Sequence, residues 1–298
     1  MYLWVKNQKV GFRILPFLLL FGTSLLSAQN SDSLKFRKKL VSYGTLASYS
    51  VSLVGLNQLW YKDYPKSEFH FFNDNAQWSQ LDKVGHAYST YTLSRASSAL
   101  FYWAGYEKEK SVWYGSGGAF LFLSTIEIFD AYSEEWGFSW GDFVANTSGI
   151  GLFLVQEKLW QKQILHLKFS YSPTSIRELR PDLFGENELQ GVLKDYNGQT
   201  YWASFNLNSL STDFKLKWLN LAVGYGADHM LYAQKNEVHS PYNSHRKQWY
   251  LGPDVNFERI QTKKKWLKTT LFLLNCIKAP LPALLLENNK LRVDWFAY

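Results

Sequence analysis

Between residues 82 and 149, acidic, amide and imidazole side chains recur at helical spacing inside segments that are otherwise apolar and aromatic. Three pairs of this kind occur along the chain: Asp82/His86, Glu127/Asp130 and Asp142/Asn146. Residues three or four apart lie on one face of a helix, and an ionisable group buried there without a partner costs on the order of several kcal/mol. We therefore expect three helical faces to bring these pairs to one polar centre.

The residue types of this centre are suited to several kinds of chemistry. A carboxylate can orient a histidine ring by accepting its proton, and further carboxylates raise the pKa of the imidazole. The candidate catalytic residues are His86, as base or ligand, with Glu127 and Asp142 orienting it or binding metal, while Asp130 and Lys83 would position a substrate. The whole polar cluster is expected to contain Asp82, Lys83, His86, Glu127, Asp130, Asp142 and Asn146. The pattern identifies no particular metal or cofactor.

The members of the cluster also have a simpler, structural interpretation. His86 is a structural histidine if it forms a hydrogen bond between helices with Asp142 or Glu127. Asp142 would then cap and stabilise a helix N-terminus, and Lys83 would lie at the surface with its charged end in water. The sequence leaves open a divalent-metal site, an acid/base site and a buried hydrogen-bond network.

Four helices are expected in the first half of the chain, over residues 40–60, 78–104, 112–130 and 140–160. Ser79 and Ser139 are the expected N-caps of the second and fourth helices. The first of these segments is about one bilayer thickness long and has no charge, and the third is nearly uncharged. The pattern predicts a four-helix bundle of the membrane type within a domain that covers residues 40–165.

The character of the chain changes after this helical domain. Residues 166–198 contain prolines, glycines and mixed charge, and are expected to form a linker. Residues 199–298 carry short alternating runs that are typical of strands, so a β-rich domain is expected there. The runs lie at residues 200–207, 218–225, 248–257, 268–274 and 291–296. The predicted fold class is α+β, with a helical bundle followed by a β-rich antiparallel region.

The first 28 residues have the order of an export signal peptide. A basic stretch precedes the apolar residues 14–26, and Ala28 supplies a small residue before the expected cleavage point. The alternative is an uncleaved membrane helix. The single cysteine, Cys276, lies far from this segment, so we expect no lipoprotein anchor, no disulfide within the chain and no cysteine-based zinc site. The protein is expected to be exported and associated with a membrane of the cell envelope, inner or outer.

Net charge and aromatic content indicate which classes of binding partner the protein has. The net charge is +7 and aromatic residues make up 18% of the chain. Aromatic side chains are common at membrane interfaces, and a basic protein is attracted to anionic lipid. No nucleic-acid-binding motif occurs. The expected partner is therefore membrane lipid or another envelope component rather than nucleic acid, and no protein partner is identified.

The order of the motifs resembles a known family. Asp-Lys-x-x-His at 82–86, Glu-x-x-Asp at 127–130, and Ser-Trp-x-Asp with Asn-x-x-Gly at 139–149 are similar to the YfiM-like domain of unknown function. That domain is similar in pattern to VanZ-like membrane proteins, and the resemblance covers roughly residues 40–165. It implies a periplasmic or envelope protein without a settled activity. The chain differs from YfiM-like lipoproteins because it lacks their lipobox cysteine.

Two functional hypotheses follow from these features. In the first, the chain is a non-enzymatic envelope protein whose polar cluster fixes helix packing and whose β-rich region contacts a partner or a membrane. In the alternative, it is a membrane-embedded hydrolase or transferase that acts on a lipid-linked or cell-wall substrate.

Overall fold

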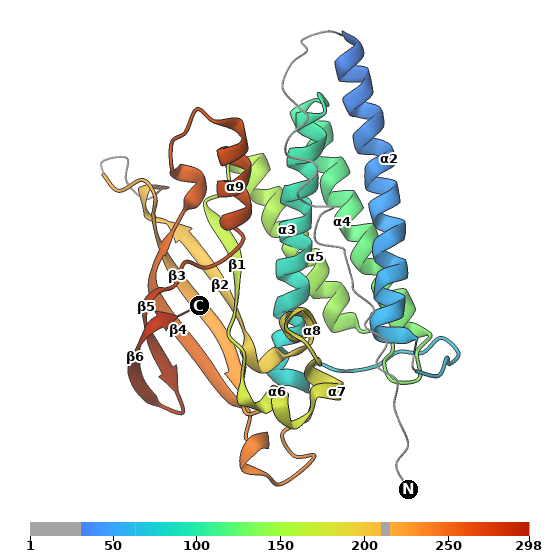
Figure 1. Cartoon of the computed structure of the whole chain (residues 1–298), viewed down its shortest axis with the longest axis vertical. Helices are drawn as coiled ribbons and strands as arrows, with labels where there is room; N and C mark the ends of the chain where they lie inside the picture. Colours follow the sequence, from blue (N-terminus) through green and yellow to red (C-terminus); the bar gives the residue numbers. More distant parts are fainter. Residues whose placement is uncertain (1–30, 63, 210–214, 298) are drawn as a thin grey trace, which may run out of the picture.

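The computed structural model describes residues 31–62, 64–209 and 215–297, so the expected signal peptide lies outside the described residues. The predicted α+β class is confirmed: long helices come first and a six-stranded antiparallel sheet follows (Figure 1). The long helices are α2 (Ser31–Leu56), α3 (Leu81–Trp103), α4 (Lys108–Ala131) and α5 (Trp140–Trp160). Figure 1 shows them side by side on one side of the sheet.

The starts of α3 and α5 differ in their local chemistry. Ser139 accepts a hydrogen bond from the backbone N–H of Asp142 and caps α5, as its sequence position predicts. Ser79 does not cap α3, so that expectation is wrong. It lies in a turn in which Trp78, Ser79 and Gln80 all have positive φ, and Gln80 precedes the first helical residue. Tyr225 Oη donates to the carbonyl oxygen of Ser79 at 2.6 Å, which ties this turn to the sheet.

Helix α3 is the central helix, packed against both α4 and α5. Two glycines make this possible, because a Cβ atom at either position would meet α3 at less than 3.0 Å. Gly115 of α4 faces the backbone of Ser98, and Gly149 of α5 faces the backbone carbonyl of Ala87. The close approach brings the polar faces of the three helices within side-chain reach.

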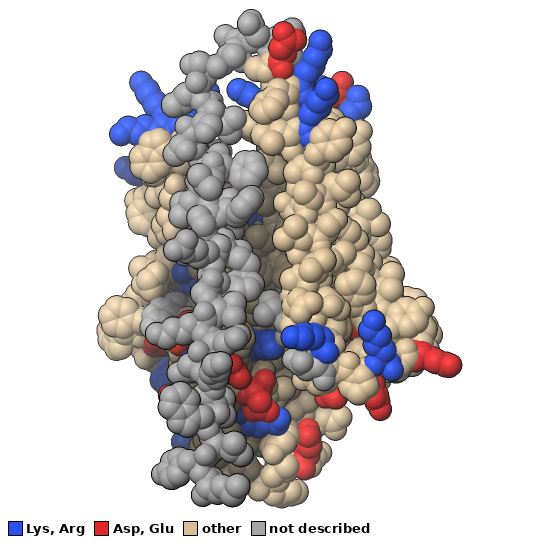
Figure 2. Space-filling view, turned by 45° about the vertical axis from the view of Figure 1, so that its right-hand side comes forward, with Lys and Arg blue, Asp and Glu red and all other residues tan. Residues whose placement is uncertain are grey.

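Helix α2 lies on the outside of this group. Tyr49 connects it to α4 through a hydrogen bond to Thr125 Oγ1 at 2.6 Å and an edge-to-face contact with Phe122. Much of its remaining surface is exposed and apolar. In Figure 2, charged side chains lie mainly toward the two ends of the visible helices, with few between them. Among the described residues, α4 is the one helix whose length and composition would let it cross a membrane.

The sheet is a meander in which each strand pairs with the next one in the chain. Its strands are β1 (Leu165–Tyr171), β2 (Gln199–Asn206), β3 (Leu219–Asp228), β4 (Arg246–Val255), β5 (Leu281–Glu287) and β6 (Lys290–Ala297). Strands β1 and β2 pack against α3, where Tyr88 contacts the rings of Phe169 and Tyr201. The sheet therefore covers the side of α3 that α4 and α5 leave free.

Two segments differ from the sequence-based expectation. The segment expected to be a linker begins with β1 and continues with three short helices, α6 (Ser175–Leu179), α7 (Pro181–Phe184) and α8 (Glu188–Lys194). The alternation of apolar and polar residues in β1 is followed directly by a segment that contains Pro173 and Pro181, which are typical of irregular structure. The run at 268–274, expected to be a strand, belongs instead to helix α9 (Lys265–Leu274). A short apolar run of this length does not by itself distinguish the two structures.

The two faces of β3 and β4 are unlike each other. Small or polar side chains such as Asn220, Ala222 and Asp254 point to the enclosed face and are fully buried. On the other face, beyond the part that α3 covers, large apolar side chains are about half exposed. They include Leu221, Val223, Trp249 and Leu251.

Candidate polar site of the helical domain

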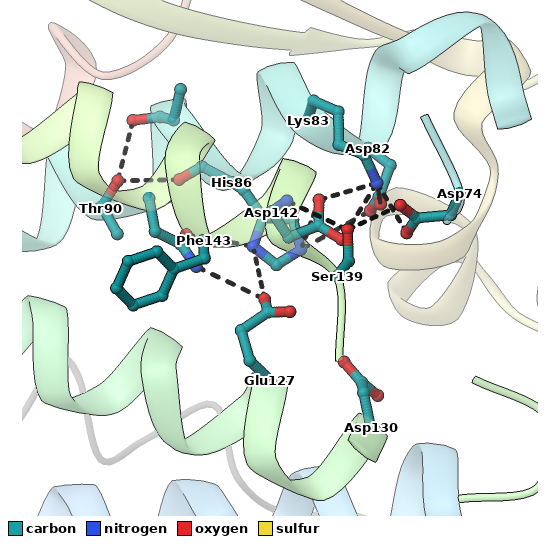
Figure 3. Close-up of polar contacts among 12 residues, drawn as sticks. Asp74, Asp82, Lys83, His86, Thr90, Glu127, Asp130, Ser139, Asp142 and Phe143 are labelled. Carbon is teal, nitrogen blue, oxygen red and sulfur yellow. Dashed lines mark hydrogen bonds and ion pairs between the residues drawn. The ribbon is translucent and has the colours of Figure 1, made fainter. Parts of the chain in front are cut away.

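The three helices place the predicted polar residues around one histidine. His86 comes from α3, Glu127 from the last turns of α4, and Asp142 and Asn146 from the first turns of α5. Figure 3 shows the His86 ring between Glu127 on one side and the group of Asp82, Lys83 and Asp142 on the other. The side chains of Glu127, Asp142 and Asn146 are buried, and that of His86 is 17% exposed.

The two ring nitrogens of His86 have different surroundings. Nδ1 lies 3.1 Å from Asn146 Oδ1 and 3.4 Å from Glu127 Oε1. Since Asn146 Nδ2 donates to Glu127, its Oδ1 is left to accept a hydrogen bond from the N–H at His86 Nδ1. Nε2 instead lies 3.7 Å from Asp82 Oδ1 and 3.8 Å from Asp142 Oδ1. Both of these distances are too long for a hydrogen bond.

Lys83 is the second cationic group of the cluster. Its ammonium group lies 2.6 Å from Asp74 Oδ2, 3.0 Å from Asp82 Oδ2 and 2.9 Å from Asp142 Oδ1. Ser139 donates to Asp74 Oδ1 at 2.6 Å and so fixes this carboxylate while capping α5. Lys83 therefore has carboxylate partners on three sides and is not the surface residue of the structural interpretation.

Asp130 belongs to the edge of the cluster. It accepts a hydrogen bond from Tyr61 at 2.6 Å and contacts neither His86 nor Lys83 within hydrogen-bond or ion-pair distance among the described residues. Tyr61 comes from the π-helical turn Asn57–Tyr61 that follows α2. The structure thus brings six of the seven predicted residues together and places the seventh nearby.

Sequence reasoning missed three residues of the site: Asp74, Tyr61 and Tyr196. Tyr196 Oη donates to Asp82 Oδ1 at 2.8 Å, from a turn more than one hundred residues away in the chain. Asp74 lies in an acidic and amide-rich loop, and both tyrosines lie among many other aromatic residues. No spacing rule connects such positions to a helical motif, so the sequence carried no usable signal for them.

The charges of the cluster shift one another's protonation. Burial raises the pKa of Glu127 to about 8, with His86 opposing this effect. Burial and the nearby Asp82 raise the pKa of Asp142 to about 7. Burial opposes ionisation of Asp82, but His86 and Lys83 together lower its pKa to about 2. For His86, burial is outweighed by Asp82, Asp142 and Glu127, which raise its pKa to about 9. Strongly displaced pKa values around one group are typical of functional sites, although structural networks also produce them.

Two buried carboxylate oxygens of the cluster have unmet hydrogen-bonding capacity. Glu127 Oε2 has no hydrogen-bond partner among the described residues. Asp142 Oδ1 lies close to Lys83 but forms no hydrogen bond of good geometry with it. A buried acceptor without a partner is unfavourable by about 1–3 kcal/mol. Both atoms are therefore suited to interact with a further positive group.

The cluster opens into a cavity of about 380 Å³ between the helices, the short helix α8 and the sheet. Asp82, His86 and Asp142 form part of its wall. The rest of the wall is mainly aromatic and aliphatic, and includes Trp78, Tyr88, Trp136, Phe169, Tyr196 and Tyr201. The arrangement is a largely apolar cavity with a few convergent polar groups at one end, which is the usual form of a small-ligand site.

Residues 69–157 match the model of a family described as a predicted periplasmic lipoprotein, DUF2279, a domain of unknown function. The matched segment contains all the predicted cluster residues. No curated protein and no solved structure matches the chain. The match supports an uncharacterised envelope domain and agrees with the exported, envelope-associated location expected from the sequence. The finer resemblance to YfiM-like and VanZ-like proteins stays a prediction.

Proposed function

We propose that this envelope protein binds a divalent metal ion at Asp82, His86 and Asp142. The observation that carries the proposal is the gap between His86 Nε2 and the two carboxylates. The ligand atoms of the three residues all lie within 4.8 Å of one another. Bonds from zinc or a similar metal to nitrogen and oxygen measure about 2.0–2.2 Å, so ligand atoms on one ion are separated by at most about 4.4 Å. The separations of 3.7 and 3.8 Å fit an ion between them.

The opposite side of the histidine supports the same proposal. A metal-binding histidine almost always donates its second ring N–H to a carboxylate or carbonyl oxygen, which orients the ring. His86 Nδ1 has Asn146 Oδ1 at 3.1 Å and the buried carboxylate of Glu127 at 3.4 Å. Glu127 is thus a positioning residue, and in its ionised form it increases the basicity of the imidazole.

The local charge also favours a cation. Four acidic residues, Asp74, Asp82, Glu127 and Asp142, contact the two basic residues Lys83 and His86, and a fifth, Asp130, lies at the edge of the cluster. With Lys83 charged and His86 bound as neutral imidazole, the carboxylates still exceed the local positive charge. Lys83 reduces but does not cancel the attraction, and it restrains Asp82 and Asp142 by donating to the Oδ2 atom of each carboxylate, while it also lies 2.9 Å from Asp142 Oδ1.

The donor set narrows the choice of metal. One imidazole nitrogen with carboxylate oxygens suits Zn²⁺, Mn²⁺, Fe²⁺ or Ni²⁺ better than Ca²⁺ or Mg²⁺, which prefer oxygen ligands alone. The chain supplies three ligands at this point, and the wall of the cavity adjoins them. A site with three protein ligands and an open position is the arrangement that metallohydrolases use to activate water. This feature supports the hydrolase or transferase alternative as a second candidate function.

The structural hypothesis has its own supporting observation. Lys83 already pairs with three carboxylates, and His86 already connects α3 to α4 and α5. If these contacts serve helix packing alone, the cluster needs no ion. The two hypotheses differ in one measurable property, which is bound metal in the folded protein.

The test is metal analysis of the purified full chain after equilibration with Zn²⁺ or Mn²⁺, together with the thermal unfolding temperature with and without the ion. We expect one ion per chain and a higher unfolding temperature with metal. His86→Ala should abolish both effects, and Glu127→Gln should weaken metal affinity by about 10- to 100-fold.

The matched control is His229→Ala. His229 Nδ1 lies 3.1 Å from Asp228 Oδ2, so this histidine also has an acidic neighbour, but it belongs to no group of three ligands among the described residues. His229 should bind no metal, so the His229→Ala variant should take up as much metal as the wild type and show the same rise in unfolding temperature. If the wild-type protein stays folded without metal and takes up none, the metal site is rejected and the structural hypothesis explains the cluster.

A further inference from the structure

A second cavity, of about 570 Å³, lies at the other end of α3. Its wall comes from the end of α3, the start of α4, the end of α5 and the segment that leads from β4 into α9. Four basic side chains line it, namely Arg95, Lys108, Lys162 and Arg259, together with the acidic side chains Glu157 and Glu258. The basic groups outnumber the acidic ones, which is the reverse of the balance in the polar cluster around His86.

Arg95 is the buried member of this group, with 4% of its surface exposed. Its guanidinium lies over the ring of Phe272, 4.9 Å from the centroid, and near the ring of Tyr91. Nη2 donates to Glu258, but Nη1 has no hydrogen-bond partner among the described residues. A buried charged donor without an acceptor is strongly unfavourable. The cavity wall thus contains a fixed guanidinium with unused donor capacity.

The more exposed basic groups are also incompletely neutralised. Lys108 pairs with Glu157 at 3.5 Å. Lys162 and Arg259 form no ion pair with any described residue, although both line the cavity. His166 adds no charge, because burial and the nearby Arg95 and Lys168 hold its pKa well below the usual value. The cavity therefore carries positive charge that no acidic group within it balances.

The surface beside the cavity has the composition of a membrane-interface helix. Helix α9 contributes Phe272 to the cavity wall and exposes Trp266, Leu273 and Leu274 to solvent. Basic residues stand at its start and along its first turn, namely Lys263, Lys264, Lys265 and Lys268, all of them exposed. Lysine beside exposed tryptophan and leucine on a short surface helix is typical of helices that lie at an anionic lipid surface.

We propose that this cavity binds a phosphate group, with Arg95 as its central ligand and Arg259 and Lys162 as further cationic contacts. A guanidinium matches two phosphate oxygens with parallel N–H donors, which is why arginine is common at such sites. The group can belong to the headgroup of an anionic phospholipid or to a small phosphate compound. The composition of α9 favours the lipid source. The proposal does not depend on metal binding at His86.

The test compares the wild-type full chain with the double variant Lys162→Gln/Arg259→Gln. The control is Lys66→Gln/Lys290→Gln, which changes the net charge equally at exposed positions outside the cavity. Binding is measured to inorganic phosphate by calorimetry, to vesicles containing phosphatidylglycerol, and to vesicles of phosphatidylcholine alone. We expect the cavity variant to lose about tenfold or more in affinity and the control to lose little.

Each outcome has a defined meaning. Binding to phosphatidylglycerol vesicles that the cavity variant alone loses supports the lipid source. Binding to inorganic phosphate without a preference for phosphatidylglycerol supports a small phosphate compound. Arg95→Lys retains the charge but loses the paired donors, so it should weaken either kind of binding. The proposal is wrong if the wild type binds neither probe, or if the cavity and control variants lose the same affinity.

Discussion

Two glycines of α5 allow a quantitative test of how α5 packs on α3. A Cβ atom at Gly149 would lie less than 3.0 Å from the backbone carbonyl of Ala87 and from Thr90 Oγ1, whereas one at Gly151 would meet nothing within 4 Å. Both positions are inside α5, far from its ends. Gly149→Ala and Gly151→Ala therefore change the same helix by the same group, and only the first creates a clash.

The magnitude follows from comparing the two variants. Replacing an interior helical glycine by alanine stabilises a helix by up to about 1 kcal/mol, and this contribution is common to both. The clash costs about 1–3 kcal/mol where a core must accommodate an added methyl group. The upper part of this range applies here, because two of the three nearest obstructing atoms belong to the backbone of Ala87 and cannot rotate away. Gly149→Ala should thus be about 2–3 kcal/mol less stable than Gly151→Ala.

The assay is denaturant unfolding of the two variants and the wild type under the same conditions. Gly151→Ala should equal or exceed the wild type, and Gly149→Ala should be less stable than it. Because Gly149 lies one turn beyond Asn146, separation of α3 from α5 should also weaken metal uptake at His86. Equal stability of the two variants would refute the inferred packing of α5 on α3.

Three further predictions concern groups outside the metal site. Lys168→Met should cost about 3 kcal/mol in urea unfolding, because the buried Asp254 loses its 2.7 Å partner and keeps only Lys278, at 3.9 Å, as an ion-pair partner among the described residues. Lys158→Met, which breaks an exposed pair with Glu109, should cost less than about 1 kcal/mol. Ser139→Ala should destabilise the protein by about 1 kcal/mol through loss of the α5 cap, while Ser148→Ala, on the exposed face of α5, should change little. His166 stays neutral when folded, because burial lowers its pKa well below 6.5, so below about pH 6.5 the unfolded chain binds more protons and stability falls as pH falls. His166→Gln should lack this loss of stability below pH 6.5, as measured by urea unfolding at pH 7 and pH 5; a variant with the same pH dependence as the wild type would contradict the neutral state.

The helical half of the fold was accessible from sequence because its signals are local. Apolar segments of helical length, the Ser139 cap and the spacing of Asp82/His86 and Asp142/Asn146 all depend on neighbouring residues. The structure places these faces around one histidine. Asp74 and Tyr196 could not be predicted to join them, because their positions depend on a loop and on the docking of the sheet against α3.

The β-rich half was predicted less completely, because the local pattern of its strands is weaker. Four of the expected strands correspond to β2, β3, β4 and β6, whereas β1 and β5 were not expected. In β5, consecutive residues Leu284, Leu285 and Leu286 obscure the alternation, since only the middle one is buried. The Arg95 cavity could not be predicted from the sequence either, because its residues come from five separate segments of the chain.

In the proposed site, His86 Nε2 faces a metal ion that it shares with Asp82 and Asp142. The most direct measurement is a crystal structure of the protein soaked with Zn²⁺, with anomalous diffraction recorded on both sides of the zinc absorption edge. We expect one anomalous peak within about 2.2 Å of His86 Nε2 and of an oxygen of each carboxylate. Density without a peak there, with His86 Nε2 hydrogen-bonded directly to a carboxylate, would contradict the proposed site.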